Sequence, residues 1–193
     1  MVLLPAGTFT MGDSSLGSAM QSFAAQMAIF QAMLLAASAV HKAARWTHSL
    51  TVVRQFAGVP GALAASSLGA ATVAELVAGA LLMVPAYRTT GAVLAALIWT
   101  LYVALIVRAI VQGRRNVDCG CSFGPTSRPL GSFQIARNLV LAAVALFIAW
   151  ASAFDGTVST QGTFVLGGLA LLALYGALDQ VMALRPLRSG ELI

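Results

Sequence analysis

The stretch TTGAVLAALIWTLYVALIVRAIV, residues 89–111, decides the fold class of this chain. It is apolar almost throughout, and its single charged side chain, Arg108, lies near its end. An α-helix rises 1.5 Å per residue, so about twenty apolar residues cross the roughly 30 Å hydrocarbon core of a bilayer. The stretch is therefore predicted to be a transmembrane helix.

The rest of the chain has the same character. Of its 193 residues, 59% are hydrophobic and only 9% are charged, whereas a soluble domain carries roughly a quarter charged residues. Similar apolar runs predict further membrane helices at about 19–40, 62–84, 133–153 and 162–184. The predicted fold class is an all-α polytopic membrane protein, with the lipid bilayer as its main surroundings.

The segments between these runs complete the expected organisation. Residues 1–18 are predicted to be an exposed N-terminal arm, and they lack the basic start of a cleavable signal peptide. Residues 41–57 mix basic and apolar side chains, which indicates an interfacial helix lying on the membrane surface. A membrane domain is expected over 19–153, followed over 154–193 by the additional transmembrane helix and a short tail.

The net charge of +5 points to membrane topology rather than to nucleic acid. With five spans, all but Arg88 of the eleven Lys and Arg residues fall on the side of the 41–60 and 112–132 connections. Basic residues concentrate on the cytoplasmic side of membrane helices. This rule predicts an outside N-terminus, and a cytoplasmic C-terminus and 112–132 loop.

The only two cysteines, Cys119 and Cys121, lie in that loop and are separated by Gly120. A glycine tolerates the unusual dihedrals of a very small disulfide ring, and strain makes such a bond easier to reduce and exchange. A disulfide across one residue would also constrain little unfolded-chain entropy. The spacing favours a redox-active pair over a structural disulfide or two idle thiols.

Basic residues surround this pair, and two interpretations of them remain open. Nearby cations lower the pKa of a thiol, and Arg137, at the start of the 133–153 helix, is one such cation, together with three arginines of the loop (Arg114, Arg115 and Arg128). The same arginines also satisfy the topology rule and suit lipid headgroups. His41 is either a proton donor and acceptor or an inert interfacial side chain.

Glu75 lies near the middle of the apolar run 62–84. An ionisable residue at that depth is costly and marks a proton or ligand site by default. The alternative is a protonated glutamate that only bonds a neighbouring helix. Trp99 and Tyr102 are its expected partners, because a spacing of three places both on one helix face.

These residues resemble the methylamine utilisation protein MauE family, small membrane proteins of the DoxX-like group. The resemblance covers about residues 30–150 and is carried by Ser38-Ala39-Val40-His41-Lys42, Glu75, Leu101-Tyr102, Asp118-Cys119-Gly120-Cys121-Ser122-Phe123-Gly124 and Arg137-Asn138. The family pattern reads Cys-Gly-Cys-Phe-Gly, so Ser122 looks like an insertion. The resemblance implies a four-helix bundle core, beyond which 162–184 adds a fifth helix.

The resemblance also implies a function. It indicates a bacterial cytoplasmic membrane protein that exchanges electrons with a thioredoxin-like partner while an exported protein, such as an amine dehydrogenase subunit, matures. Whether the chain is itself an enzyme, a thiol–disulfide oxidoreductase, stays open. Carried over to this sequence, the redox pair is Cys119 and Cys121, and the supporting positions are Gly120, His41, Glu75, Tyr102, Arg137 and Asn138. No cofactor is predicted, and a quinone has no support in the sequence.

Two other functions remain open. A soft-metal carrier would use Cys119, Cys121 and His41 as ligands for an ion such as Cu(I), although two cysteines are too few for a closed tetrahedral site. A non-catalytic subunit would pack its small residues against a larger membrane complex. The predicted cytoplasmic loop also conflicts with a role outside, unless electrons cross the membrane or the pair is reached from outside.

Overall fold

The computed structural model describes residues 13–58, 60–113, 132–153 and 162–184, and within these ranges every regular element is helical. The elements are α1 (Asp13–Ala44), α2 (Trp46–Ala57), α3 (Gly61–Met83), the 3-10 turn η1 (Pro85–Tyr87), α4 (Arg88–Val111), α5 (Ser132–Ala153) and α6 (Gly162–Leu184). Four described segments are long and apolar enough to cross a membrane: Gly17–Ala44, Gly61–Met83, Pro85–Val111 and Ser132–Ser152. The predicted all-α polytopic membrane fold is confirmed.

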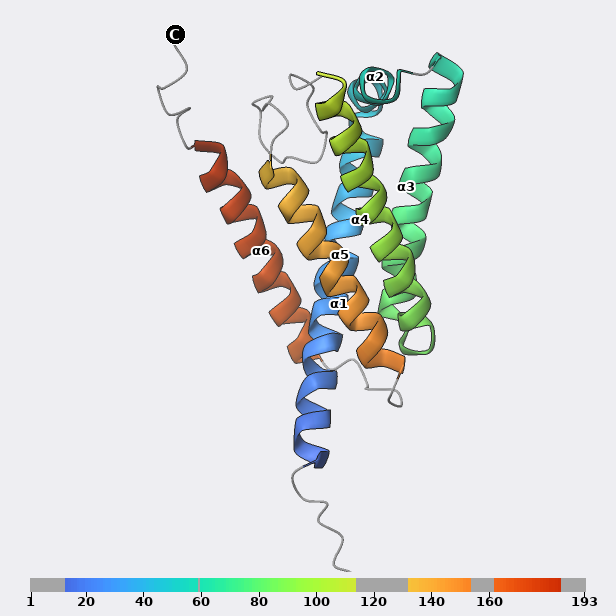
Figure 1. Ribbon diagram of the computed structural model, residues 1–193. Coiled ribbons are helices and arrows are strands. Elements are labelled where there is room, and N and C mark those ends of the chain that lie inside the picture. Colours follow the sequence, from blue (N-terminus) through green and yellow to red (C-terminus); the bar gives the residue numbers. More distant parts are fainter. Residues whose placement is uncertain (1–12, 59, 114–131, 154–161, 185–193) are drawn as a thin grey trace, which may run out of the picture.

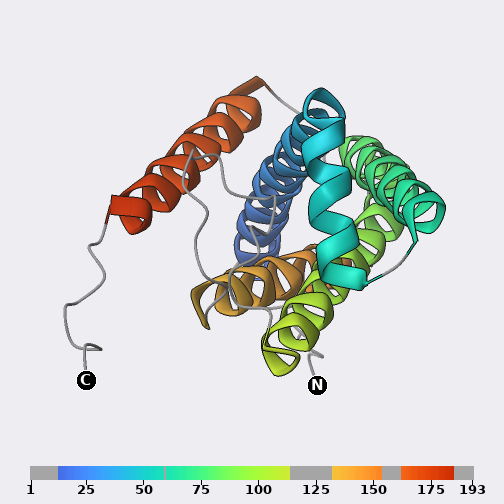
Figure 2. The same ribbon diagram turned by 90° about the horizontal axis from the view of Figure 1, so that it is seen from above.

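The long helices run alternately up and down, so that α1, α3, α4 and α5 form one bundle (Figure 1). Helix α1 is central to it, packing against α3, α5 and α6. Seen from above, α2 lies across the end of the bundle while α6 stands outside it beside α1 (Figure 2). Helix α2 thus lies over the ends of α1, α3 and α4 at one end of the bundle.

Many small side chains, packed with a few large ones, fill the centre of the bundle, and many large apolar side chains face outward. Alanines dominate the core, among them Ala28 on α1, Ala78 on α3 and Ala145 on α5, each with no exposed surface. Leu97 and Val140, by contrast, are 62% and 60% exposed. Small residues let helix backbones approach closely. Large apolar side chains can face outward because lipid tails are as apolar as they are, so burying them gains no hydrophobic free energy.

Helix α1 differs from its prediction at both ends. The helix starts at Asp13 and ends at Ala44, so residues 13–18, expected in an exposed arm, are helical, and the first turns project beyond the bundle (Figure 1). The basic pair His41 and Lys42 in the last turn complements the helix dipole. His41 and Lys42 therefore belong to α1 and not to the interfacial segment.

The other helices begin and end within one residue of the bounds predicted for 62–84, 89–111, 133–153 and 162–184. Helix α2 is amphipathic: it buries Ser49 and Val52 and exposes His48 and Arg54. Its C-cap is Gly58, whose φ of 63° is left-handed and whose N–H donates to the Arg54 carbonyl. Glycine suits this cap because it has no Cβ to clash.

Helix α6 packs on α1 through a close glycine contact. A Cβ at Gly168 would lie 2.7 Å from Cγ2 of Ile29, so only glycine allows this approach. Phe30 and Tyr175 add an edge-on ring contact, with centroids 6.0 Å apart. The apolar part of α6 that qualifies in the described chain, Val165–Leu178, is shorter than a full span. That α6 crosses the membrane stays a prediction.

Candidate functional site

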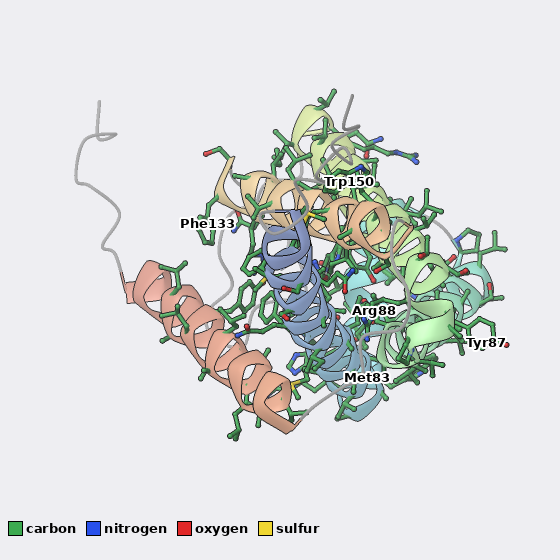
Figure 3. The ribbon with its side chains drawn as sticks, turned by 90° about the horizontal axis from the view of Figure 1, so that it is seen from below. Met83, Tyr87, Arg88, Phe133 and Trp150 are labelled. Atoms are coloured by element: carbon green, nitrogen blue, oxygen red, sulfur yellow. The ribbon has the colours of Figure 1, made fainter. Side chains whose placement is uncertain are left out.

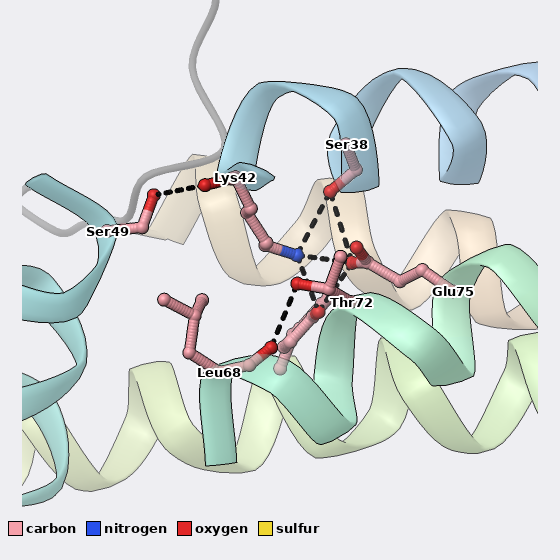
Figure 4. A network of polar contacts seen from close by, with 7 residues as sticks. Ser38, Lys42, Ser49, Leu68, Thr72 and Glu75 are labelled. Carbon is pink, nitrogen blue, oxygen red and sulfur yellow. Dashed lines mark hydrogen bonds and ion pairs between the residues drawn. The ribbon is translucent and has the colours of Figure 1, made fainter. Parts of the chain in front are cut away.

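A buried ion pair joins α1 to α3. Lys42, in the last turn of α1, is 8% exposed, and Glu75, in the middle of α3, has no exposed surface. The ammonium of Lys42 donates to Oε1 of Glu75 (Figure 4). Two charges removed from water are tolerated only when they are paired and further hydrogen-bonded.

Tyr102 on α4 and Ser38 on α1 supply those further bonds. The hydroxyl of Tyr102 donates to Oε1 of Glu75 at 2.5 Å and accepts from Nζ of Lys42 at 2.8 Å. The hydroxyl of Ser38 donates to the same Oε1 and accepts from Nζ, both at 3.1 Å. We call Ser38, Lys42, Glu75 and Tyr102 the Glu75 network; it ties three helices together at one carboxylate oxygen.

The second carboxylate oxygen of Glu75, Oε2, differs from Oε1 in its hydrogen bonding. Oε2 of Glu75 is buried and has no hydrogen-bond partner among the described residues. A buried polar atom left without a partner costs about 1–3 kcal/mol, and native structures contain few of them. The network is therefore asymmetric, with three donors on Oε1 and none on Oε2.

The Glu75 network lies beneath α2. Ser49 of α2 is buried and its hydroxyl is 3.5 Å from the backbone carbonyl oxygen of Lys42, the contact at the edge of Figure 4. On α3, the hydroxyl of Thr72 is occupied by the carbonyl of Leu68 at 2.9 Å. The hydrogen bonds to Glu75 thus come from side chains of α1 and α4 and not from Thr72 of its own helix.

A second polar cluster lies deeper along α1. Gln31, which has no exposed surface, donates from Nε2 to the carbonyl of Leu141 at 2.8 Å. Its Oε1 accepts from Nε1 of Trp99 at 2.9 Å. We call Gln31, Trp99 and Leu141 the Gln31 network; it joins α1, α4 and α5 through neutral groups.

Of the two expected partners of Glu75, only one bonds to it. Tyr102 does bond Glu75, as predicted, but Trp99 bonds Gln31 instead. Trp99 lies almost one turn before Tyr102 on α4, which places its indole N–H at the depth of Gln31. The two rings still touch edge-on, with centroids 6.0 Å apart, so the networks are neighbours.

The remaining supporting positions lie elsewhere on α1 and α5. Asn138 is buried and donates to the Gln134 carbonyl at 2.8 Å within α5. The guanidinium carbon of Arg137 lies 5.9 Å from the ring centre of Tyr175 on α6. His41 is partly exposed in the last turn of α1. These described contacts lead to α5 and α6, away from Glu75.

The predicted redox residues Cys119, Gly120 and Cys121 lie outside the described residues, as do the loop arginines. Helix α4, which precedes this segment, ends at the same end of the bundle as that at which α5 begins and α2 lies (Figure 1). Within the described ranges, no group of three or more His, Cys, Asp or Glu side chains gathers as a metal site.

The sequence did not predict the bonding partners of three members of these networks: Ser38, Lys42 and Gln31. Lys42 was assigned to a charged loop as a topology residue; the structure instead buries it against Glu75. The reason is that α1 continues past residue 40, which turns Ser38 and Lys42, four residues apart, onto one face. A carboxylate in the middle of a span called for a cation, and Lys42 was the nearest one at a helix end.

Together, the fold and the site define a small polytopic helical membrane protein with a buried ionic network near one end of its bundle. The family model described as "Methylamine utilisation protein MauE" matches residues 20–151. The chain belongs to this family. The match runs from α1 to α5 and leaves α6 outside it.

Individual relatives agree with the family match. A methylamine utilization protein MauE of Methylophilus methylotrophus is 31% identical over 154 residues, covering 78% of this chain and 81% of the relative. The proteins of the same name from Paracoccus denitrificans and Paracoccus versutus are 29% and 32% identical, each covering 76% of this chain and 80% of the relative. No solved structure matches the chain.

Proposed function

We propose that this chain is an integral-membrane thiol–disulfide redox protein in which Cys119 and Cys121 are the redox pair. The observation that supports this proposal most is an arrangement at one end of the bundle. The connection that contains Cys-Gly-Cys joins the end of α4 to the start of α5, and both lie at the end of the bundle at which α2 lies (Figure 1). The Glu75 network lies beneath that same helix.

The proposed partner is a thioredoxin-like protein that presents its own disulfide or dithiol. In one direction a thiolate of the pair attacks the partner's disulfide and forms a mixed disulfide. The second cysteine then closes the Cys119–Cys121 bond and releases the partner as a dithiol. Two electrons and two protons pass from one pair to the other, and the reverse direction balances in the same way.

The names of the relatives suggest the process that this exchange serves. Proteins called methylamine utilization protein MauE are similar to this chain over most of their length. We propose that the chain supports maturation of an exported disulfide-containing protein, such as an amine dehydrogenase subunit. General electron delivery to thioredoxin-like proteins requires the same chemistry.

The proposed membrane is the bacterial cytoplasmic membrane, with the α2 end in the cytoplasm. Arg45, Arg54 and Arg108 lie at that end of the described chain. Arg88 begins α4 at the opposite end, and Figure 3 shows it pointing into the bundle while Tyr87 points away. Because Arg88 is only 6% exposed, the opposite end presents little positive charge, as the positive-inside rule requires.

The redox proposal is tested by the state of the two thiols. The purified protein is equilibrated in thiol buffers of graded potential, alkylated, and analysed by mass spectrometry. Cys119 and Cys121 are expected to change together from two alkylated thiols to one linked pair. Cysteines that stay reduced in every buffer would remove the proposal.

The topology is tested separately with single-cysteine variants Cys119→Ser and Cys121→Ser. A membrane-impermeant maleimide should label the remaining thiol in inverted vesicles and leave it unlabelled in right-side-out vesicles. A cysteine introduced at the exposed Tyr87, in a variant without Cys119 and Cys121, serves as the control with the opposite pattern. Labelling of the native thiols from outside would reverse the proposed orientation.

A further inference from the structure

We propose that α2 and its N-cap form a binding surface for anionic phospholipids, in which Arg45 and Arg54 bind lipid phosphates and Trp46 lies beside the acyl chains. We call these three residues the α2 surface. The inference goes beyond the proposed redox function and does not depend on it, because it uses only residues that the structure describes.

The first argument is the charge of the α2 surface. Arg45 is the N-cap residue of α2 and Arg54 lies in its last turn, while Arg108 lies nearby in the last turn of α4. All three are exposed, and none of their guanidinium groups forms an ion pair or a hydrogen bond with another described residue. The α2 surface therefore presents positive charge that no described carboxylate neutralises.

Carboxylates are scarce on the helices around this surface. Helix α2 packs against α1, α3 and α4. The described carboxylates of these four helices are Asp13, at the far end of α1, and Glu75, which is buried and paired with Lys42. The anion that complements the arginines therefore comes from outside the described chain. A phosphate group suits them, because the N–H donors of a guanidinium match its oxygens in pairs.

The second argument is the position of Trp46. Its side chain lies against α3, where a Cβ at Gly69 would be 3.9 Å from Cη2 of the indole. Gly69 follows Gly61, the first residue of α3, by eight residues, which is about 12 Å along a helix axis. The indole thus reaches from the end of the bundle along the apolar span of α3. Trp46 is also 39% exposed, and tryptophan is typical of the membrane–water interface.

The third argument is the order of charge and apolar surface along α3. The guanidinium of Arg54 lies at the start of this helix, because a Cβ at Gly61 would be 2.7 Å from its Nη2. Further along α3, Leu63 and Val73 are 57% and 59% exposed. Helix α2 itself lies across the end of the bundle (Figure 2), as an interfacial helix lies in the plane of the headgroups.

This order decides between two kinds of anionic partner. An acidic protein would complement the arginines alone. A phospholipid complements the arginines with its phosphate, and the indole and the exposed side chains of α3 with its acyl chains. Basic residues at a membrane surface also bind anionic lipids more tightly than neutral ones. The α2 surface therefore fits an anionic phospholipid better than an acidic protein.

The test measures quenching of tryptophan fluorescence by brominated lipids, with the full-length protein in phosphatidylcholine vesicles. Brominated phosphatidylglycerol and brominated phosphatidylcholine are compared at equal mole fraction. We expect phosphatidylglycerol to quench with an apparent affinity about threefold higher or more, a preference that added salt weakens. Trp46→Phe should abolish the preference. Trp150→Phe, which removes an exposed tryptophan near the opposite end of the bundle, should leave it unchanged.

Two double variants test the arginines. Arg45→Gln with Arg54→Gln should lose most of the preference, whereas Arg45→Lys with Arg54→Lys should keep most of it, because the positive charge remains. A folded glutamine variant with the full preference, or a folded lysine variant with none, would contradict the assignment. If the glutamine variant does not fold, the lysine variant and the salt dependence of the natural protein decide.

Equal quenching of the natural protein by the two lipids overturns the inference. If the glutamine variant then also binds a thioredoxin-like protein more weakly, the α2 surface belongs to a protein partner instead. The redox state of Cys119 and Cys121 is measured independently of these experiments. Cysteines that never link would remove the proposed function and leave the lipid surface standing.

Discussion

The two polar networks of α1 differ in charge and in how completely their polar atoms are hydrogen-bonded. The Gln31 network uses an amide, an indole and a backbone carbonyl, and both polar atoms of the Gln31 side chain have a partner. The Glu75 network uses a full ion pair, collects every donor on Oε1 of Glu75, and leaves Oε2 without a partner among the described residues. Both networks join α1 to α4.

The difference separates a structural cluster from a candidate functional one. Neutral groups with complete hydrogen bonding are inexpensive to bury, because no charge is removed from water. A buried ion pair with one bare oxygen is costly, and native chains keep such features chiefly at functional sites. Substitutions in each network should therefore change different quantities.

The largest effect on stability is expected for Lys42→Met. It leaves the fully buried carboxylate of Glu75 without its cation, and breaking a buried pair in this way costs about 3–5 kcal/mol. Thermal denaturation in detergent should show a large loss for this variant. The double variant Lys42→Met, Glu75→Leu should recover most of it, because no charge remains buried.

Arg45→Met is the matched control for that prediction. Arg45 lies three residues after Lys42 and is exposed, so its removal should change the unfolding temperature very little. A loss as large as that of Lys42→Met would show that charge near the end of α1, and not the pair with Glu75, is responsible.

Tyr102→Phe is expected to have the next largest effect. It removes the hydroxyl that donates to Oε1 of Glu75 at 2.5 Å, and hydrogen bonds to charged groups contribute about 1.5–3 kcal/mol. The exposed Tyr87→Phe is the matched control and should be neutral in the same denaturation measurement. Equal losses for the two tyrosines would contradict the prediction.

Gln31→Leu should cost about 1–3 kcal/mol, because it leaves the indole N–H of Trp99 buried without its acceptor. The same loss should not change the redox state of Cys119 and Cys121, measured by alkylation in graded thiol buffers. A shift in that redox behaviour would show that the Gln31 network is more than structural.

Ser38→Ala should have the smallest effect. Its hydroxyl is 3.1 Å from both Oε1 of Glu75 and Nζ of Lys42, and side-chain hydrogen bonds between membrane helices average about 0.6 kcal/mol. The unfolding temperature of this variant should lie close to that of the natural protein. A loss comparable to that of Lys42→Met would mean that Ser38 positions the pair.

The site was predictable in part. Glu75 stood out because a carboxylate in an apolar run is rare, and Tyr102 followed from its depth on the next helix. The pairing of Lys42 with Glu75 was not predicted, because residues near the predicted end of a span look like loop residues until the helix is seen to continue to Ala44. Gln31 gave no indication of its partners, because an amide in an apolar helix bonds to whichever helix packs against it.

What the sequence by itself determined is the class of the molecule and the placement of most of its helices. Long apolar runs, ended by turn residues and basic groups, locate helices α3 to α6 to within one residue. The reason is that exposing charge or unbonded backbone groups to lipid is costly at the residue concerned, so each apolar run ends where its helix ends. Only the tertiary structure decided which buried groups meet. Lys42, Glu75 and Tyr102 are far apart in the chain, and their contact depends on the rotation and depth of three helices, which packing of small side chains between them sets.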